Sequence, residues 1–450
     1  MLSCALLPML ALELLQGPDE LSYDPNVVGD LGGYSARAED VIGMLGGASW
    51  VVVGGSENVN GDFHAFLENE AGLIDLGTFG GPLSEAVAVN VFEEVVGWAD
   101  SIGANGAVSA RAFSWSAGSG LVDLGDLGGY RSWATDIDIY SSFICGTSET
   151  QAGDLHAFFL NPASGGMVDC GTLGGSWSQA NATGNMTVVG QSQNTQGFKR
   201  AFLWSSWSGM SDLGALNGGI SDATDISLNG YICGWSSTGN PGEVHAVFYQ
   251  SFPTSQIIDL GTLGGGISLA HSINNRADVV GTSETISGDW HAFYWDEDTG
   301  RMHDLNEFIH PASGWVLESA NHLTDSGWIC GSGTFNGRRQ GFVLRPFRMS
   351  VLGSTAGTNV TFRAYDLEPG LKVYFAASLM TGRFPIPGFP GLELGLHSPI
   401  RVASSVVGVG TKMASVSVFA PLSIKGMTIH FQAVVPPRYL VSPIFSKTFF

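Results

Sequence analysis

The sequence has little charge, and positive charge is scarcest of all. Only 13% of its 450 residues are charged, and 19 Lys and Arg stand against 41 Asp and Glu, for a formal charge of −22. Binding to nucleic acid needs a basic surface that displaces counterions, so this composition argues against a nucleic-acid partner. Apolar residues make up 44% of the chain. That supply of buried surface argues against an intrinsically disordered protein.

Cysteine is also scarce, with five residues in the chain. Three of them, Cys145, Cys233 and Cys330, stand between Ile and Gly, in a sequence context where other copies of the same pattern carry Val. We therefore expect small buried hydrophobic side chains here, and neither disulfides nor a cysteine metal site.

Long apolar runs are absent outside the N-terminus, so we expect no integral membrane segment. The run within residues 1–16 is too short to span a bilayer comfortably. It fits a secretory signal in length, although Glu13 interrupts it and no basic residue precedes it. We predict a leader at residues 1–22 and an exported protein, extracellular or at the cell surface. An unusual cytoplasmic leader is the alternative.

Glycine, by contrast, is abundant, with 63 residues, about twice the usual share. Many of them belong to a repeat in which Asp-Leu-Gly, or a close variant, is followed by Gly-Gly. Its aspartates lie 43 to 48 residues apart, at Asp30, Asp75, Asp123, Asp169, Asp212, Asp259 and, in a degenerate copy, Asp304. Four short apolar segments alternate with turn residues in each copy, a pattern typical of four antiparallel strands.

This period predicts an all-β fold, a seven-bladed β-propeller with four-stranded blades over residues 23–348. The last copy lacks its fourth strand. Residues 26–31 resemble that strand, so we expect the N-terminal segment to complete the seventh blade and remove an exposed sheet edge.

Residues 349–450 form a separate region by composition. Residues 350–450 carry eight basic and three acidic side chains, or +5, so the preceding chain carries −27. Runs at 359–365, 372–376, 414–419 and 428–434 read as strands between Pro-Gly turns, and we predict a small β-sandwich.

The repeat resembles the bacterial HAF-repeat family of extracellular proteins. The clearest copy runs from Asp259 to Trp295, with Val279-Val280-Gly281 and His291-Ala292-Phe293. Departures from the family pattern are Arg111, Arg200 and, in the last copy, Gly341 in place of His, and Val247 in place of Phe. The resemblance implies export, and the family brings no established reaction.

Histidine and aspartate recur at fixed places in the repeat. The histidines are His64, His156, His245 and His291. Third strands of separate blades lie too far from a propeller axis for these side chains to converge on one metal ion, so we expect each to bond the backbone of its own blade. We interpret the aspartates Asp75, Asp123, Asp169, Asp212 and Asp259 as turn anchors that accept backbone N–H groups.

Acidic loops between the second and third strands are candidate ligand sites. They contribute Glu57 and Asp62, Glu149 and Asp154, and Glu284 and Asp289. Oxygen ligands beside a flexible glycine suit calcium, so a calcium site at Glu149, Asp154, Glu284 and Asp289 is one hypothesis, and solvated acidic loops are the other.

Tryptophans form a second candidate set on the same face. Trp98 and Trp290 are the ligand candidates, with Trp133, Trp177 and Trp235 in similar positions. Such side chains either stack on sugars or pack between blades.

Motifs of nucleophile, zinc-protease, phosphate-loop and dinucleotide chemistry are absent. We therefore predict a non-catalytic binding or scaffold module that recognises an extracellular glycan, polymer or protein through its acidic loop face. We expect no cofactor, and calcium is the one candidate left open. The first alternative is a polysaccharide hydrolase or lyase with carboxylates such as Glu149 and Glu284 at the propeller mouth. The second is a purely structural envelope protein. The oligomeric state stays open.

Overall fold

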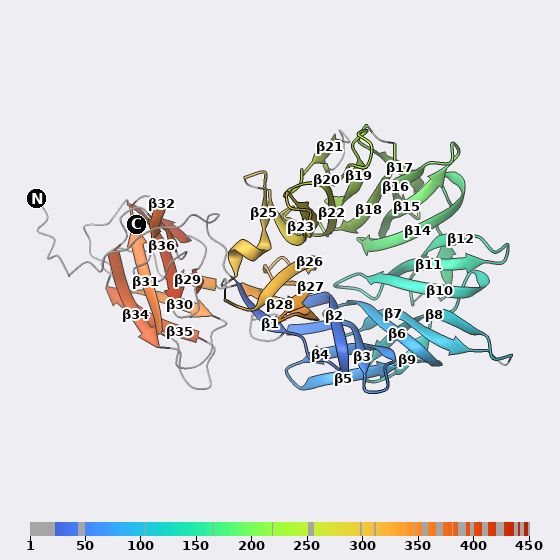
Figure 1. Cartoon of the computed structure of the whole chain (residues 1–450), viewed down its shortest axis with the longest axis horizontal. Coiled ribbons are helices and arrows are strands. Elements are labelled where there is room, and N and C mark those ends of the chain that lie inside the picture. Colours follow the sequence, from blue (N-terminus) through green and yellow to red (C-terminus); the bar gives the residue numbers. More distant parts are fainter. Residues whose placement is uncertain are drawn as a thin grey trace, which may run out of the picture. The chain divides into compact units, whose positions relative to one another are not determined.

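In a computed structural model of the chain, regular structure is almost entirely β-strand (Figure 1). The structure describes residues 23–352, apart from 44–49, 104, 164, 218, 251–255, 298, 310–311 and 347, and shorter stretches between 359 and 448. One 3-10 turn, Leu305–Phe308, is the sole helical element among them. None of these residues belongs to a helix with the length and apolar character needed to cross a membrane.

The strands of residues 26–344 form antiparallel sheets of four. Sheet 1 contains β2 (Gly32–Gly43), β3 (Trp50–Asn58), β4 (Phe63–Asn69) and β5 (Gly72–Gly77), and sheet 2 contains β6 (Gly80–Val89), β7 (Val95–Ile102), β8 (Val108–Ser116) and β9 (Gly120–Asp123). Sheet 3 contains β10 (Gly128–Ile137), β11 (Ile144–Thr150), β12 (Leu155–Leu160) and β13 (Met167–Asp169). Sheet 4 contains β14 (Gly174–Gly184), β15 (Thr187–Asn194), β16 (Lys199–Ser205) and β17 (Gly209–Gly214).

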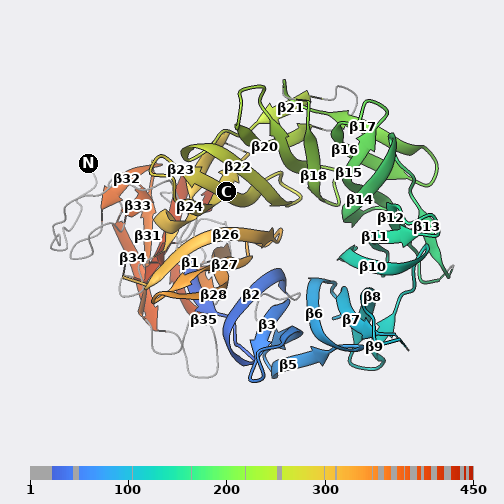
Figure 2. The same cartoon turned by 45° about the vertical axis from the view of Figure 1, so that its right-hand side comes forward.

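Sheets 5 and 6 follow the same order and are joined by one parallel pair between Val244 and Ile267. They are β18 (Ser221–Ile226), β19 (Ile232–Ser237), β20 (Val244–Gln250) and β21 (Gln256–Asp259), then β22 (Gly264–Ile273), β23 (Val279–Thr285), β24 (Trp290–Asp296) and β25 (Arg301–Asp304). Figure 2 shows the sheets following one another around a common centre, with their first strands innermost. The described architecture is therefore all-β and propeller-like.

Sheet 7 joins the two ends of the repeat array. Its strands β26 (Trp315–Leu323), β27 (Ile329–Phe335) and β28 (Arg338–Pro346) are completed by β1 (Tyr23–Val27), which pairs with β28. The N–H of Val28 donates to the carbonyl of Gly341 at 3.0 Å. The N-terminal segment thus supplies the missing strand as predicted, although this strand spans Tyr23–Val27 and shares only residues 26 and 27 with the predicted stretch 26–31.

Every first strand contains a β-bulge at the same place. In β2 the pairing with β3 shifts between Ala38 and Asp40, and the six other first strands shift at equivalent positions. A bulge places one extra residue in its strand and redirects the neighbouring side chains. The glycine of the Val-Val-Gly phrase faces it. In sheet 2, a Cβ on Gly97 would overlap the carbonyl oxygen of Glu85, so the close approach requires glycine.

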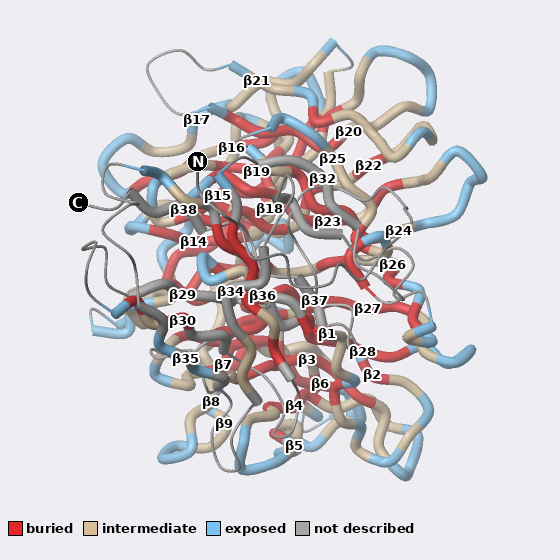
Figure 3. Tube along the Cα trace, turned by 90° about the vertical axis from the view of Figure 1, so that its left-hand side faces the viewer, coloured by how far each residue is buried: buried red, intermediate tan, exposed pale blue. Residues whose placement is uncertain are grey.

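Buried residues lie mainly along the strands and exposed residues mainly in the loops (Figure 3), and the core clusters combine residues of neighbouring sheets. One cluster combines Cys145 and Phe159 of sheet 3 with Phe202 and Trp204 of sheet 4, and other clusters pair adjacent sheets in the same way. The cysteines Cys145, Cys233 and Cys330 are fully buried and free, which confirms the expected hydrophobic role. Six phenylalanines at the third position of the His-Ala-Phe phrase or its variants are fully buried as well, namely Phe66, Phe113, Phe158, Phe202, Phe293 and Phe342.

Serine hydroxyls bond one sheet to the next and explain two repeated phrases. The Oγ of Ser84 accepts the N–H of Ala65 at 2.9 Å and donates to the carbonyl of Gly77 at 2.6 Å. Serines in the next four first strands repeat this arrangement. The Ser-x-Ala and His-Ala phrases therefore meet across each of these junctions.

The C-terminal strands belong to a second compact unit, which includes Arg345–Phe450. β29 (Arg348–Leu352), β30 (Asn359–Tyr365) and β35 (Met413–Phe419) form one sheet; β34 (Ile400–Val406), β31 (Lys372–Ser378), β36 (Thr428–Val435), β37 (Leu440–Val441) and β38 (Phe445–Thr448) form another; β32 (Thr381–Pro385) pairs with β33 (Glu393–Leu396). Phe362 of the first sheet lies 5.6 Å and 5.2 Å, centroid to centroid, from Phe375 and Phe431 of the second. Aromatic packing between two sheets is the arrangement expected of a β-sandwich.

Candidate functional site

The first strands of sheets 1 to 7 surround a cavity of about 310 Å³. Each strand contributes two consecutive residues to its lining, which are Glu39 and Asp40, Val87 and Ala88, Thr135 and Asp136, Asn181 and Ala182, Thr224 and Asp225, His271 and Ser272, and Asn321 and His322. We refer to this space as the axial cavity.

The bulges explain why consecutive residues share one face. In a regular strand, neighbouring side chains point to opposite faces of the sheet. The register shift in each first strand falls at the first residue of its pair, for example between Ala134 and Asp136 around Thr135. The extra residue turns both members of the pair toward the axis.

The first residues of the pairs form a ring of hydrogen bonds between sheets. The Oγ1 of Thr135 donates to the carbonyl of Ala180 at 3.1 Å, and Nδ2 of Asn181 donates to Ala223 at 2.8 Å. Thr224, His271 and Asn321 continue the series, and the last of these reaches Ala38 in sheet 1 at 2.9 Å. The series does not include Glu39, whose carboxyl accepts a hydrogen bond from Asn321, or Val87, whose side chain has no polar group.

The second residues form another ring, built on carboxylates from alternate sheets. The Oδ2 atoms of Asp40, Asp136 and Asp225 accept the backbone N–H of a residue in the next sheet at 2.7 to 2.8 Å. Nδ1 of His322 lies 3.0 Å from Oδ1 of Asp40 and closes the array. These carboxylates therefore serve as links between sheets and as the acidic groups of the cavity.

The protein surroundings shift the protonation of this ring. Burial, with the negative charges of Asp225 and Asp40, raises the pKa of Asp136 well above its usual range. Burial lowers the pKa of His322, but attraction to Asp40 outweighs that effect and raises the pKa to about 9. His322 therefore carries a positive charge at neutral pH, whereas burial lowers the pKa of His271.

Beside the cavity, the carboxylates of Glu39 and Glu85 share the guanidinium of Arg37. Nε of Arg37 lies 3.1 Å from Oε1 of Glu39, and the same guanidinium contacts Glu85. Nδ2 of Asn321 donates to Glu39 at 3.1 Å. Burial and the nearby Glu85 raise the pKa of Glu39 to about 7, so this carboxyl exchanges a proton near neutral pH. Clusters of shifted pKa values are typical of functional sites.

The lining of the cavity limits the chemistry of its ligand. It offers carboxylate, amide, hydroxyl and imidazole groups, and none of its fourteen residues is aromatic. Sugar sites commonly stack the ring on an aromatic face. A compact ligand that donates hydrogen bonds and carries positive charge suits this lining better.

The glutamates predicted as ligand groups are bonded within their own sheets. Oε2 of Glu57 accepts the N–H of Tyr34 at 3.1 Å, and Glu149 and Glu284 accept the N–H groups of Tyr130 and Gly266 in the same way. These bonds hold the start of the first strand against the end of the second. Hydrogen bonds from Tyr130 and Arg131 lower the pKa of Glu149.

The aspartates of these loops lie on the same three hairpins. Asp154 and Asp289 are exposed, Asp62 is half-buried, and Oδ2 of Asp289 accepts the hydroxyl of Ser287 at 2.7 Å. Within the part of the chain that the structure describes, no three His, Cys, Asp or Glu side chains are grouped to hold a metal ion. The calcium hypothesis therefore gains no support from the described residues.

The two candidate tryptophans differ in their surroundings. Trp98 lies inside β7, half-buried, where it pairs with Ala112 of β8 rather than projecting from a loop. Trp290 begins β24 and is exposed. Neither lines the axial cavity.

The repeated histidines bond a side chain, not the backbone as expected. Nδ1 of His64 lies 2.9 to 3.0 Å from the carboxylate of Asp75, the repeat aspartate of its own sheet. The same pairing joins His156 to Asp169, His245 to Asp259, and His291 to Asp304. Arg111 and Arg200 reach Asp123 and Asp212 from the equivalent positions, which explains why arginine replaces histidine there. The aspartates also accept N–H groups two residues ahead, as at Gly77 and Gly171.

Sequence reasoning missed the residues of the axial cavity, Glu39, Asp40, Asp136, Asp225 and His322 among them. A signal was present, because each pair directly follows the Ser-x-Ala phrase or its variant, and the alanine of that phrase pairs with the glycine of the next strand. Strict alternation along a strand would place only one member of each pair on the axial face.

The fold and this cavity define an all-β, propeller-like repeat protein with a polar axial site. No family model and no curated protein matches the chain.

Similar solved structures include a Mycobacterium tuberculosis puromycin-hydrolysing peptidase, with 11% identity over 78% of this chain and a TM-score of 0.44. This chain covers 61% of the peptidase's length. A gluconolactonase from Xanthomonas campestris is 10% identical over 71% of this chain and 99% of its own, with a TM-score of 0.34. Fructan 1-exohydrolase IIa from Cichorium intybus is 7% identical over 97% and 92%, with a TM-score of 0.26. Likenesses this distant assign no function.

Proposed function

We propose that the chain is an exported, non-catalytic binding module of the HAF-repeat type, in which seven blades surround one ligand site. The axial cavity carries this proposal. It collects polar side chains from six of the seven first strands, whereas the loop glutamates are already bonded within their own sheets. The ligand site therefore moves from the acidic loop face, where the sequence predicts it, to the axis.

The ligand is a compact cationic group such as an ammonium, free or presented by a polymer or protein. Asp40 and Asp225 supply carboxylates, and Asp136, whose pKa burial raises well above its usual range, supplies a carboxyl group beside Thr135 and Asn181. His322 neutralises part of this charge, so the cavity stays acidic overall. A positive ligand completes the neutralisation without the aromatic platform that a neutral sugar needs.

Calorimetric titration of the purified chain with small amines, neutral polyols and carboxylic acids tests this function. We expect heat of binding with amines and none with the acids. Val87→Lys should abolish binding, because it places an ammonium in the cavity without removing a hydrogen bond. Val122→Lys is the matched control, since Val122 is 43% exposed on β9 of the same sheet. Absence of binding by any class, or equal binding by both variants, would contradict the proposal.

Hydrolysis of a glycosidic bond is a second candidate function, and the Glu39–Glu85 pair favours it. Both carboxylates contact Arg37, and a pKa of about 7 suits Glu39 to act as a general acid. Turnover of polysaccharides or aryl glycosides that Glu39→Gln removes and Glu57→Gln retains would support this candidate. No turnover is expected if the cavity only binds.

A further inference from the structure

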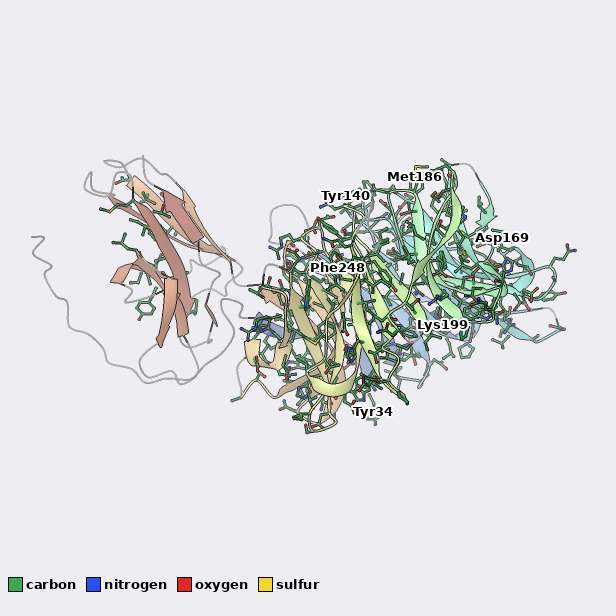
Figure 4. All side chains as sticks on the ribbon, turned by 90° about the horizontal axis from the view of Figure 1, so that it is seen from above. Tyr34, Tyr140, Asp169, Met186, Lys199 and Phe248 are labelled. Atoms are coloured by element: carbon green, nitrogen blue, oxygen red, sulfur yellow. The ribbon has the colours of Figure 1, made fainter. Side chains whose placement is uncertain are left out.

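Three exposed apolar side chains lie on neighbouring loops at one end of the sheets. Phe92, Tyr140 and Met186 come from the turns between the first and second strands of sheets 2, 3 and 4, and are 63%, 57% and 42% exposed. Figure 4 shows Tyr140 and Met186 on one side of the sheets and Tyr34 on the opposite side. We refer to these three residues as the apolar end patch.

Hydrogen bonds hold the three loops to one another. The N–H of Val91 donates to the carbonyl of Ile139 at 3.1 Å, and Nδ2 of Asn90 donates to Ser141 at 3.2 Å. The N–H of Asn185 donates to Asp138 at 3.2 Å. The apolar end patch is therefore a preformed platform, which reduces the entropy lost when a partner binds.

Two of the three loops contain residues in left-handed backbone conformation. Met186 has a φ of 62° and Glu93, beside Phe92, has a φ of 57°. Left-handed backbone is unusual for long side chains and tends to persist where the surrounding structure, or a function, requires it. Aromatic residues and methionine are also enriched in protein interfaces.

Charge around the patch is of one sign. The loops at 90–94, 138–143 and 184–187 contain Glu93, Glu94 and Asp138 and no Lys, Arg or His. Glu94 and Asp138 accept hydrogen bonds from neighbouring loops, for example from Ser142 and Asn185. A partner for this platform therefore combines apolar with basic side chains.

One region of the chain has that composition. Residues 350–450 carry +5 while the rest of the chain carries −27, and they are rich in Val and Phe. We propose that the apolar end patch docks the C-terminal region, residues 350–450, of a second copy of this chain. The contact joins two different surfaces, so copies associate head to tail, either in closed rings of two or more copies or in open chains.

Sedimentation of the full chain over a hundredfold range of concentration tests the proposal. We expect the mass to grow from the monomer to a dimer or larger as concentration rises, and the growth to weaken at least severalfold between about 0.05 M and about 0.5 M salt. Monomers throughout the range, or association that salt leaves unchanged, would overturn the proposal.

Substitutions then locate the surface. The triple variant Phe92→Ser, Tyr140→Ser and Met186→Asn should weaken assembly at least tenfold, and asparagine suits the backbone at position 186. Tyr34→Ser is the matched control, because Tyr34 is 78% exposed on the opposite side. Glu93→Lys should weaken assembly severalfold through charge alone. Equal loss in Tyr34→Ser, or no effect of Glu93→Lys and of salt, would exclude a basic partner at this patch.

Discussion

Nδ1 of His322 lies 3.0 Å from Oδ1 of Asp40, and this ion pair joins β26 of sheet 7 to β2 of sheet 1. The two residues come from the ends of the repeat array and meet at the axial cavity. Asp40 also accepts the N–H of Val89 in sheet 2, so one carboxylate links three sheets. The stability of the closed array therefore depends on the charge of one histidine.

The first prediction is a loss of stability as pH rises past neutral. The folded pKa of His322, about 9, is above its ordinary value of 6.5. Its contribution is therefore complete below pH 6.5 and is lost as pH rises through 9. We expect the free energy of unfolding, from urea titrations, to fall by about 1 to 3 kcal/mol across this window, because solvent screens a side chain that is 30% exposed.

The variant His322→Asn should flatten the profile between pH 6.5 and 9. Glu39→Gln serves as its control, because the raised pKa of Glu39 costs stability in a lower window, from pH 4.5 to 7. A profile of the wild type that rises between pH 7 and 9 would be incompatible with the His322–Asp40 pair.

The second prediction concerns the glycine opposite each bulge. Gly97→Ala places a methyl group on the carbonyl oxygen of Glu85 and should cost about 3 kcal/mol or more, since backbone must move to relieve the overlap. Gly118→Ala in the same sheet meets no atom within 4 Å and should change stability by less than about 0.5 kcal/mol. Equal effects in thermal unfolding would show that the bulge geometry is wrong.

The third prediction ranks three changes at one His–Asp pair. Asp169→Ala removes the partner of His156 and the acceptor for the N–H of Gly171, and should cost about 1 to 2 kcal/mol. His156→Ala should cost about 0.5 kcal/mol, because the pair is partly exposed. His156→Arg should be nearly neutral, as arginine fills this position in sheets 2 and 4. Denaturant titrations that reverse this order would count against the pairing.

The fourth prediction tests the closing strand. Val28 is 1% exposed in a core cluster with Phe66, Trp328 and Val343, whereas Val27 is 44% exposed. Val28→Ala should cost about 1 to 2.5 kcal/mol and Val27→Ala less than about 0.5 kcal/mol. If calorimetry gives equal melting temperatures for both variants, the N-terminal segment does not complete sheet 7.

The repeat in the sequence determined the strand order, the buried cysteines and the closing of the array by the N-terminal segment. These features are local or periodic, so the spacing of Asp, Gly and apolar residues is enough to predict them.

Only the tertiary structure decided where the polar groups meet. The bulges turn Asp40 and its equivalents toward the axis, and a bulge depends on the pairing of two strands rather than on a sequence period. The loop glutamates look free in the sequence, yet they are bonded to backbone N–H groups that come close only in the folded sheet. Sequence thus determined the repeated element, and the packing of those elements around one axis created the site.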